Sequence, residues 1–341
     1  MDHRIPVTII TGFLGAGKTT LLNRLIKGHP EKKFAIIENE FGEIGIDGGL
    51  IASNDDNIFE LSNGCICCSL NDGFYETLAK LLNSELPFNH LLIETTGIAD
   101  PDSIIKAFLS SEQIQLNFRI DSVICLADCS NMEDLMDEQP EVRKQLALAD
   151  VVLLNKADTV QADYLLELKK IIAHINPMAQ LYPMQYGELN EINLVDLNAF
   201  STKAVEQATM SFKSLSFIKG PVISNSLLSQ PTRSELKHDI SSLGFIIPGS
   251  FDSDKFSMWM QNFLFFNRHN IFRIKGIVSF ENRPEKQIIQ AVRDSAMLEA
   301  GADWGSESRF SKLVFIGKKL DHDQLEDSLY QLLHNPLETA K

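Results

Sequence analysis

Along the first half of the chain, short continuous apolar runs alternate with segments in which apolar residues recur every three or four positions. A continuous run predicts a strand covered on both faces, whereas the wider spacing predicts a helix with one apolar face. The predicted strands span residues 7–10, 34–38, 57–61, 91–94, 122–127, 151–155 and 181–184. The predicted helices span residues 18–28, 70–82, 101–108, 132–149 and 164–175. This alternation indicates an α/β, doubly wound fold with a mostly parallel sheet, whose ligands bind at the carboxyl ends of the strands.

A change of pattern divides the chain after this region. Residues 201–237 lose clear periodicity and are rich in Ser, Thr, Lys and Gln, which favours a connection between domains. A second pattern then predicts strands at residues 244–248, 272–280 and 313–316 and helices at residues 253–266, 284–297 and 324–333. We therefore predict a first domain over residues 1–205, a linker over 206–237 and a smaller α+β C-terminal domain over 238–341.

A glycine-rich segment joins the first predicted strand to the first predicted helix. Its sequence matches the P-loop pattern G-x-x-x-x-G-K-[ST], in which backbone N–H groups surround a phosphate. Lys18 would reach the β- and γ-phosphates, and the Thr19 hydroxyl would bind Mg²⁺. A glycine-rich turn without a ligand is the alternative, but the strand before it and the helix after it favour a P-loop. The predicted phosphate-binding residues are Gly12, Gly15, Ala16, Gly17, Lys18, Thr19 and Thr20.

The predicted strand at residues 91–94 ends in an acid. Glu94, with Gly97 three positions later, has the form of a Walker B segment. Its carboxylate would hold Mg²⁺ through water, and the Gly97 N–H could contact the γ-phosphate of a nucleoside triphosphate. Lys18, Thr19 and Glu94 form the predicted catalytic set, to which the sequence adds no evident general base.

The predicted strand at residues 151–155 ends in the guanine-recognition motif of GTPases, Asn155-Lys156-Ala157-Asp158. Asp158 can accept hydrogen bonds from guanine N1–H and from the 2-amino group. Adenine offers neither donor and would leave the carboxylate unpaired. Lys156 can lay its aliphatic stem along the base. Because the motif ends a strand about 140 residues after the P-loop, it favours a GTPase over an ATPase.

Three cysteines lie within four positions: Cys65, Cys67 and Cys68. Thiolates are soft ligands that suit Zn²⁺, Cu⁺ or iron–sulfur clusters. An extended segment would point Cys65 and Cys67 the same way, and Cys68 would need a turn to join them. Three thiolates leave one tetrahedral position for another group. A redox pair or buried small side chains are the alternatives, but the clustering favours a metal.

Other polar residues leave alternatives open. The carboxylates from Glu38 to Glu43 fit either a solvated loop or the phosphate-sensing switch segment that GTPases carry after the P-loop helix. Cys125 lies in an apolar strand pattern and is predicted to be a core residue. Three isolated histidines are predicted to be linker or surface residues: His238, His322 and His334.

The composition narrows the class of protein. The chain has 341 residues, of which 44% are hydrophobic and 23% charged, and a formal net charge of −15. Polyanions repel an acidic protein, so we expect neither general nucleic-acid binding nor binding to an anionic membrane. No apolar run approaches the roughly 20 residues needed to cross a bilayer, and no signal peptide is visible. Five cysteines in so long a chain do not suggest a disulfide framework, which predicts a cytoplasmic protein.

Together these motifs resemble those of the CobW-like metallochaperone GTPases, and the Cys-x-Cys-Cys motif attached to a GTPase core is the most specific of them. The resemblance extends into the C-terminal domain through Arg273-Ile-Lys-Gly276, Ala302-Asp303-Trp304 and Val314-Phe-Ile-Gly317. It implies low intrinsic GTPase activity, binding of Zn²⁺ or a similar divalent ion, and delivery of that ion to a client protein. The metal-binding positions that it implies are Glu38, Glu43, Cys65, Cys67 and Cys68.

One feature departs from the family pattern. Many members carry a histidine-rich stretch before or inside the second domain, whereas only His238 stands there in this chain. A large auxiliary metal store is therefore not expected.

The leading hypothesis is an enzyme that hydrolyses GTP to GDP and phosphate, and whose nucleotide state sets its affinity for a transition metal. The thiolates favour Zn²⁺, although Co²⁺ and Cu⁺ bind similar sites, and Mg²⁺ is expected with the nucleotide. One alternative is a metal-buffering or sensing protein with incidental GTPase activity. Another is a GTP-dependent activator that inserts a metal cofactor into one enzyme. The expected partners are GTP and a client metalloprotein.

Overall fold

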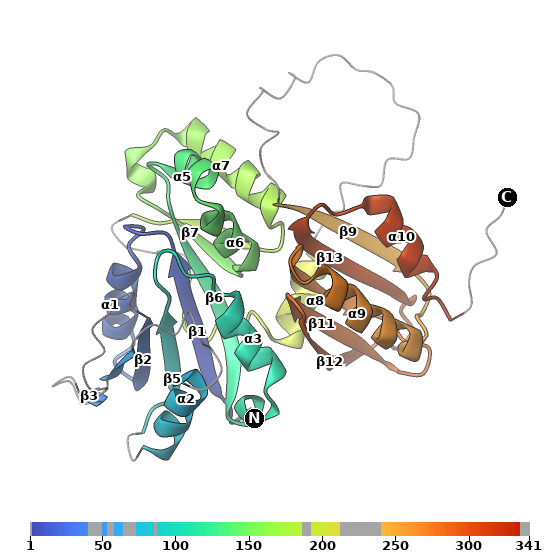
Figure 1. Cartoon of the computed structure of the whole chain (residues 1–341), viewed down its shortest axis with the longest axis horizontal. Helices are drawn as coiled ribbons and strands as arrows, with labels where there is room; N and C mark the ends of the chain where they lie inside the picture. The colour runs from blue at the N-terminus through green and yellow to red at the C-terminus, as the bar shows by residue number, and fades with distance from the viewer. Residues whose placement is uncertain are drawn as a thin grey trace. The chain divides into compact units, whose positions relative to one another are not determined.

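The computed structural model describes residues 2–39, 50–52, 58–63, 73–84, 87–185, 192–211 and 240–334. The chain divides into two units, Met1–Ser201 and Thr202–Lys341. Each unit has its own sheet (Figure 1). Each also has its own hydrophobic core. Over the ranges given above, no helix combines the length and the apolar character needed to span a membrane.

An eight-stranded sheet forms the centre of the first unit, with the strand order β3-β4-β2-β5-β1-β6-β7-β8. Every pairing is parallel except that of β3 with β4, so the predicted doubly wound, mostly parallel sheet is confirmed. The strands are β1 (Ile5–Gly12), β2 (Phe34–Asn39), β3 (Leu50–Ala52), β4 (Ile58–Asn63), β5 (His90–Glu94), β6 (Phe118–Asp128), β7 (Val151–Asn155) and β8 (Gln180–Pro183).

Helices connect these strands. They are α1 (Lys18–Gly28), α2 (Gly73–Asn83), α3 (Asp102–Ser110), α4 (Glu112–Asn117), α5 (Met132–Glu138), α6 (Pro140–Leu148), the short η1 (Ala157–Thr159) and α7 (Ala162–Ile175). The region 132–149, predicted as one helix, contains two. Pro140 begins α6, and Gln139 before it is extended (φ −122°, ψ 98°), as the residue that precedes a proline prefers.

The order of the strands reverses at β1, which lies between β5 and β6. Such a reversal is the usual ligand site of an open α/β sheet, at the carboxyl ends of its strands. Helix α1 is held there because Leu21 and Leu22 pack against Ile10 and Ile124 of the sheet. This packing fixes the start of α1 beside the end of β1.

The second unit contains a five-stranded antiparallel sheet with the strand order β12-β11-β10-β13-β9. Its strands are β9 (Ile240–Pro248), β10 (Ile271–Val278), β11 (Glu285–Val292), β12 (Ser295–Asp303) and β13 (Phe310–Lys318). Its helices are α8 (Thr202–Ser211), α9 (Ser253–Asn267) and α10 (His322–Tyr330). The predicted α+β class of this domain is confirmed.

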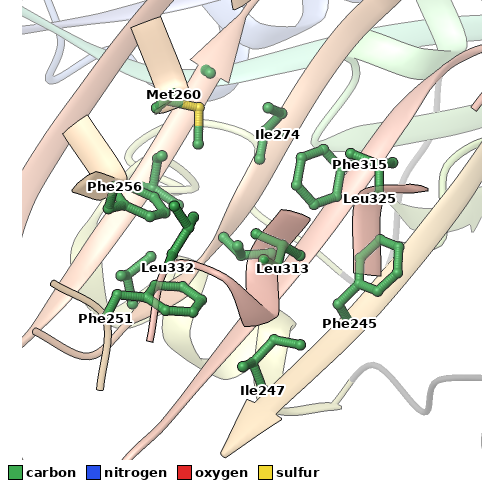
Figure 2. Close-up of a cluster of buried hydrophobic side chains, with 14 of the residues drawn as sticks. Phe245, Ile247, Phe251, Phe256, Met260, Ile274, Leu313, Phe315, Leu325 and Leu332 are labelled. Atoms are coloured by element: carbon green, nitrogen blue, oxygen red, sulfur yellow. The ribbon is translucent and has the colours of Figure 1, made fainter. Parts of the chain in front are cut away.

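Helices cover both faces of this second sheet (Figure 1). On one face, strand side chains pack against α9 and α10 in the core of Figure 2, which includes Phe245, Phe256, Met260, Ile274, Leu313, Phe315 and Leu325. On the other face, Val205 of α8 packs with Ile277, Ile288 and Trp304. Successive strand residues point to opposite faces, so the neighbours Ile277 and Val278 belong to different clusters.

Two predictions for the second half of the chain are wrong. Residues 284–297 form no helix, because β11 and β12 pair there as a hairpin whose turn contains Arg293 with φ of 57°. The apolar spacing fits either element, and pairing of β11 with β10 decides for strand. Irregular structure was expected from residue 201, whereas α8 forms and packs on the sheet. Residues 212–239, with His238, lie outside the described residues.

Near the amino ends of its central strands, the first unit contains a buried polar network. Asp121, fully buried in β6, accepts hydrogen bonds from the backbone N–H groups of Leu197 (3.0 Å) and Asn198 (2.8 Å). Thr8 Oγ1 lies 3.4 Å from the same carboxylate and 2.9 Å from His90 Nε2. Because the Thr8 hydroxyl donates to Asp121, His90 donates from Nε2. The network ties residues 197 and 198 to the sheet just before the first unit ends.

His90 is neutral in this network. Burial lowers its pKa to about 4, although Asp196 Oδ1, 3.7 Å from Nδ1, opposes the shift. Asp196 pairs instead with Lys32 at 2.5 Å. The unfolded chain takes up a proton on this histidine near the ordinary pKa of 6.5. The unfolded state therefore binds more protons between these two values, and acidification through this window destabilises the fold.

We expect His90 to make the free energy of unfolding fall by up to about 3 kcal/mol as the pH drops from about 7 to about 4.5. The variant His90→Gln keeps a donor for Thr8 and cannot be protonated, so its urea-unfolding free energy should depend less on pH. The exposed His269→Gln should keep the wild-type pH dependence. Equal pH dependence of His90→Gln and the wild type would assign the effect to another group.

Candidate functional site

The segment between β1 and α1 is shaped to approach a ligand with its backbone. Gly12 and Gly17 have φ of 140° and 101°, conformations that L-residues with a side chain rarely adopt. A Cβ on Gly12 would lie 2.4 Å from Leu126 O, and a Cβ on Gly17 would lie 2.7 Å from Asn155 Nδ2. Gly17 begins α1 without a side-chain cap, which leaves first-turn N–H groups for an anion.

Lys18 folds back over this segment. Its Nζ donates to the carbonyls of Gly12 (2.9 Å) and Phe13 (3.3 Å), and only 8% of the residue is exposed. Burial lowers the pKa of Lys18, and the charge of Glu94 opposes the shift. A buried ammonium held by two neutral carbonyls is a ready partner for a phosphate.

Thr19 and Glu94 meet at the junction of α1 and β5. Thr19 Oγ1 donates to Glu94 Oε1 over 3.3 Å, and β1 and β5 pair so that Ile10 lies opposite Glu94. A hydroxyl and a carboxylate are the hard oxygen ligands that Mg²⁺ prefers. The donor atoms of Thr19 and Glu94 are therefore of the kind that binds a magnesium ion.

The loop after Glu94 touches the phosphate loop. A Cβ on Gly97 would lie 2.5 Å from Leu14 N and 2.6 Å from Leu14 Cγ, so only glycine allows this approach. The backbone of Gly97 thus lies directly beside the segment that the P-loop pattern assigns to phosphate.

The guanine-recognition motif is tied to the same segment. Asn155 at the end of β7 donates from Nδ2 to Ala16 O at 2.8 Å. Its Oδ1 accepts the Lys156 N–H at 2.9 Å, and Lys156 adopts φ of 57°. Asp158 follows on η1 with an exposed side chain. The structure thus joins Asn155 directly to the phosphate loop, and Lys156 and Asp158 follow it along the chain.

Asp128 joins this motif and was missed in the sequence analysis. Its Oδ2 lies 2.6 Å from Lys156 Nζ, and its Oδ1 accepts hydrogen bonds from the N–H and hydroxyl of Ser130. Burial opposes ionisation of Asp128, but the bonds from Lys156 and Ser130 outweigh it and lower the pKa. Asp128 ends β6 and pairs in register with Asn155, which ends β7. A carboxylate at the end of the predicted strand before the guanine motif was therefore the signal that could have identified Asp128.

The predicted transition-metal ligands lie outside the described side chains. Glu43, Cys65, Cys67 and Cys68 belong to ranges that are not described, and for Glu38 only the backbone is. The flanking strands are informative, because Glu38 of β2 pairs with Glu94 of β5 and with Ser62 of β4. The carboxyl ends of β2 and β4 therefore lie on the same edge of the sheet as the phosphate loop.

The cysteines of the described ranges, Cys125 and Cys129, are buried. Burial raises the pKa of Cys125 to about 12 and that of Cys129 to about 11, so both thiols are inert core residues, as expected for Cys125. Over those ranges, one group of three close metal-ligand candidates occurs, His322, Asp323 and Glu326. It lies at the start of α10 in the second unit, and Asp323 is largely exposed.

Two known protein families match this chain. Residues 6–183 match the CobW/HypB/UreG nucleotide-binding domain, and residues 240–333 match the Cobalamin synthesis protein cobW C-terminal domain.

Individual relatives align over nearly the whole chain. The zinc chaperone YjiA of Escherichia coli (strain K12) is 33% identical over 327 residues, which cover 94% of this chain and 96% of that protein. The zinc-regulated GTPase metalloprotein activator 1 of Saccharomyces cerevisiae is 28% identical over 370 residues, which cover 97% and 84%. The crystal structure of the Zn(II)-bound YjiA GTPase from E. coli superposes with a TM-score of 0.71 at 28% identity, covering 97% of this chain and 99% of that one.

The Asp128–Lys156 pair leads to a prediction about nucleotide affinity. Asp128→Asn removes the charge that holds Lys156, so we expect GDP to bind about tenfold more weakly. Titration with a fluorescent GDP analogue measures this change. Asp137→Asn is the matched control, because it removes a different aspartate–cation pair of the same unit, the one with Arg143. Wild-type affinity of Asp128→Asn for GDP would exclude Asp128 from the base site.

Proposed function

This chain belongs to the CobW family of GTPases, and on that premise we propose that it hydrolyses GTP and uses its nucleotide state to bind zinc and deliver it to a client protein. The matches to both CobW domains support the proposal, as do the relatives named as zinc chaperones. We also propose that nucleotide and metal bind to the first domain, residues 1–205.

The observation that carries the proposal is the meeting of three motifs at one edge of the sheet. Asn155 binds the phosphate loop directly, Thr19 bonds to Glu94, and Gly97 touches Leu14. A site for base, phosphates and metal is what a GTPase requires, because its catalysis consists of positioning and of charge stabilisation.

In the proposed reaction, water attacks the γ-phosphate of GTP, and GDP leaves. Lys18 exchanges the carbonyls of Gly12 and Phe13 for phosphate oxygens. Its buried positive charge then has a negatively charged partner instead of two neutral ones. Thr19 and Glu94 would hold Mg²⁺, which neutralises charge on the phosphates. Asp158 accepts hydrogen bonds from guanine, while Asp128 keeps Lys156 in place beside the base.

In this proposal the zinc ion is cargo rather than a resident cofactor. Its ligands are the thiolates of Cys65, Cys67 and Cys68 together with Glu38 or Glu43. Support comes from the pairing of β2 with β5 and β4, because Glu38 lies near the carboxyl end of β2, and Glu43 and the three cysteines follow in sequence the strand ends that lie at the nucleotide edge. A γ-phosphate can thereby influence both segments. We propose the cytosol as the compartment, because clustered thiols require a reducing environment.

The name of the yeast relative, a GTPase metalloprotein activator, favours a second candidate function. In that case the protein would insert a metal into one specific enzyme instead of supplying zinc to several clients. Capture of partners by the zinc-loaded, GTP-analogue-bound protein distinguishes the two, because an activator should retain one client only.

We expect GTP and zinc to strengthen each other's binding. By linkage, a non-hydrolysable GTP analogue should raise zinc affinity relative to GDP by the same factor by which zinc raises affinity for the analogue, and about 5- to 150-fold is ordinary for such coupling. Competition with a chelator of known affinity measures it. Equal zinc affinity in both states would favour a metal-buffering protein. Unchanged affinity of a Cys65/Cys67/Cys68 triple-alanine variant would locate the metal elsewhere.

Glu94 is expected to matter for turnover more than for binding. Glu94→Gln keeps the size of the side chain and loses its charge, so phosphate release should slow by about 10- to 100-fold, while GDP affinity stays within about threefold. Glu112→Gln, a change of an exposed acid on α4, serves as the control. Phosphate release at the wild-type rate in Glu94→Gln would remove Glu94 from the mechanism.

A further inference from the structure

A buried glutamine on α6 binds the loop that follows Glu94. Gln145 is 1% exposed, and its Nε2 donates to Gly97 O at 3.1 Å and to Ala99 O at 3.2 Å. Two carbonyl acceptors fix the orientation of this side-chain amide, because its oxygen could not accept a hydrogen bond from either of them. Gln145 therefore uses both of its N–H hydrogens on a single loop.

The oxygen of the Gln145 amide suggests that this residue does more than fill space in the core. Gln145 Oε1 is buried and has no hydrogen-bond partner in the described part of the chain. An unsatisfied buried oxygen costs roughly 1–3 kcal/mol, which an apolar side chain of similar size would avoid. Stability alone therefore does not favour glutamine at this position. What glutamine adds over an apolar residue is the pair of hydrogen bonds to the loop.

Helix α6 provides a fixed support for these bonds. Asn176, fully buried after α7, donates from Nδ2 to the carbonyls of Leu146 (2.8 Å), Ala147 (3.3 Å) and Ala149 (2.8 Å). Leu146 and Ala147 lie in the last turn of α6 and Ala149 is its C-cap, so Asn176 binds carbonyls at a helix end, where the usual partners four residues later are missing. The side chain of Gln145 thus extends from a helix whose carboxyl end is anchored.

The loop is held on its other side by β1 and by its own turn. Thr95 N donates to Ile10 O at 2.9 Å, and Ala99 N donates to Thr96 O at 3.0 Å. The Thr96 carbonyl lies in the same peptide plane as the Gly97 N–H, and the Gly97 carbonyl lies in the next plane. Both peptide planes that flank Gly97 are therefore fixed, one by the turn and one by Gln145.

We propose that Gln145 is a positioning residue for GTP hydrolysis: it fixes the peptide plane that follows Gly97, and so helps to hold the Gly97 N–H, in the plane before it, where it can bind the γ-phosphate. This inference rests on the proposed GTPase function. In the described part of the chain, the hydrogen bonds of the Gln145 side chain go to the carbonyls of Gly97 and Ala99, so Gln145 acts through the loop. Its loss should therefore weaken recognition of the γ-phosphate and leave recognition of GDP intact.

The variant Gln145→Met tests this role, because methionine has a similar volume and no donor. We expect about a tenfold loss of affinity for a non-hydrolysable GTP analogue, a comparable drop in kcat, and GDP affinity within about twofold of the wild type. The control is Gln115→Met in α4, where Nε2 donates to Leu109 O at 2.6 Å, away from the site. Equal loss of analogue and GDP binding would reduce Gln145 to a structural residue and overturn the proposal.

A second variant keeps the test decisive if Gln145→Met fails to fold. Gln145→Glu can donate one hydrogen bond when its carboxyl is protonated, and burial raises the pKa of such a group. Its GTPase rate relative to the wild type should rise as the pH falls from about 8 to about 6. A flat ratio would overturn the positioning role. A wild-type chain that neither binds nor hydrolyses GTP would overturn the proposed function instead, so the two failures are distinguishable.

Discussion

The hydrogen bond from Asn155 Nδ2 to Ala16 O is the interaction on which the nucleotide site depends. It joins the base motif to the phosphate loop, and it requires glycine at position 17, because a Cβ there would lie 2.7 Å from the same nitrogen. Pairing of β6 with both β1 and β7 fixes the separation that this bond spans. Two motifs far apart in sequence thereby act as one site.

The stretch from α6 to η1 holds this site at several points. Gln145 binds the loop that contains Gly97, Asn155 binds the phosphate loop, and Lys156 pairs with Asp128 at the end of β6. These contacts lie at opposite ends of the nucleotide that we propose, at the γ-phosphate and at the base.

The sheet of the second unit has helices on both of its faces, and this arrangement affects its sequence pattern. The sheet is covered by α9 and α10 on one face and by α8 on the other, so the central strands β10 and β11 carry buried apolar residues on both faces. Polar positions remain where α8 supplies partners, as in the pair of Lys286 with Glu206 at 2.7 Å. Doubly covered strands lose the simple alternation of a half-buried sheet, which is why their pattern was ambiguous.

The amino-acid sequence by itself determined the parallel, doubly wound sheet of the first unit, because continuous apolar runs and intervening helices allow few other folds. It also predicted the P-loop residues, Glu94, Gly97 and Asn155 to Asp158 as site residues, since each follows a predicted strand and lies within a short local motif. The CobW resemblance rested on these motifs together with the Cys-x-Cys-Cys motif and short motifs of the C-terminal domain.

Only the tertiary structure decided the features that depend on distant partners. Asp128 and Gln145 lie in no motif, and their roles follow from contacts with Lys156 and with the carbonyls of Gly97 and Ala99. The hairpin of β11 and β12 forms because β10 pairs with β11, although the apolar spacing also fits a helix. Helix α8 is stabilised mainly by packing on the second sheet, since its own periodicity is weak. Local patterns specify backbone and motif, whereas these features require neighbours that the folded chain brings together.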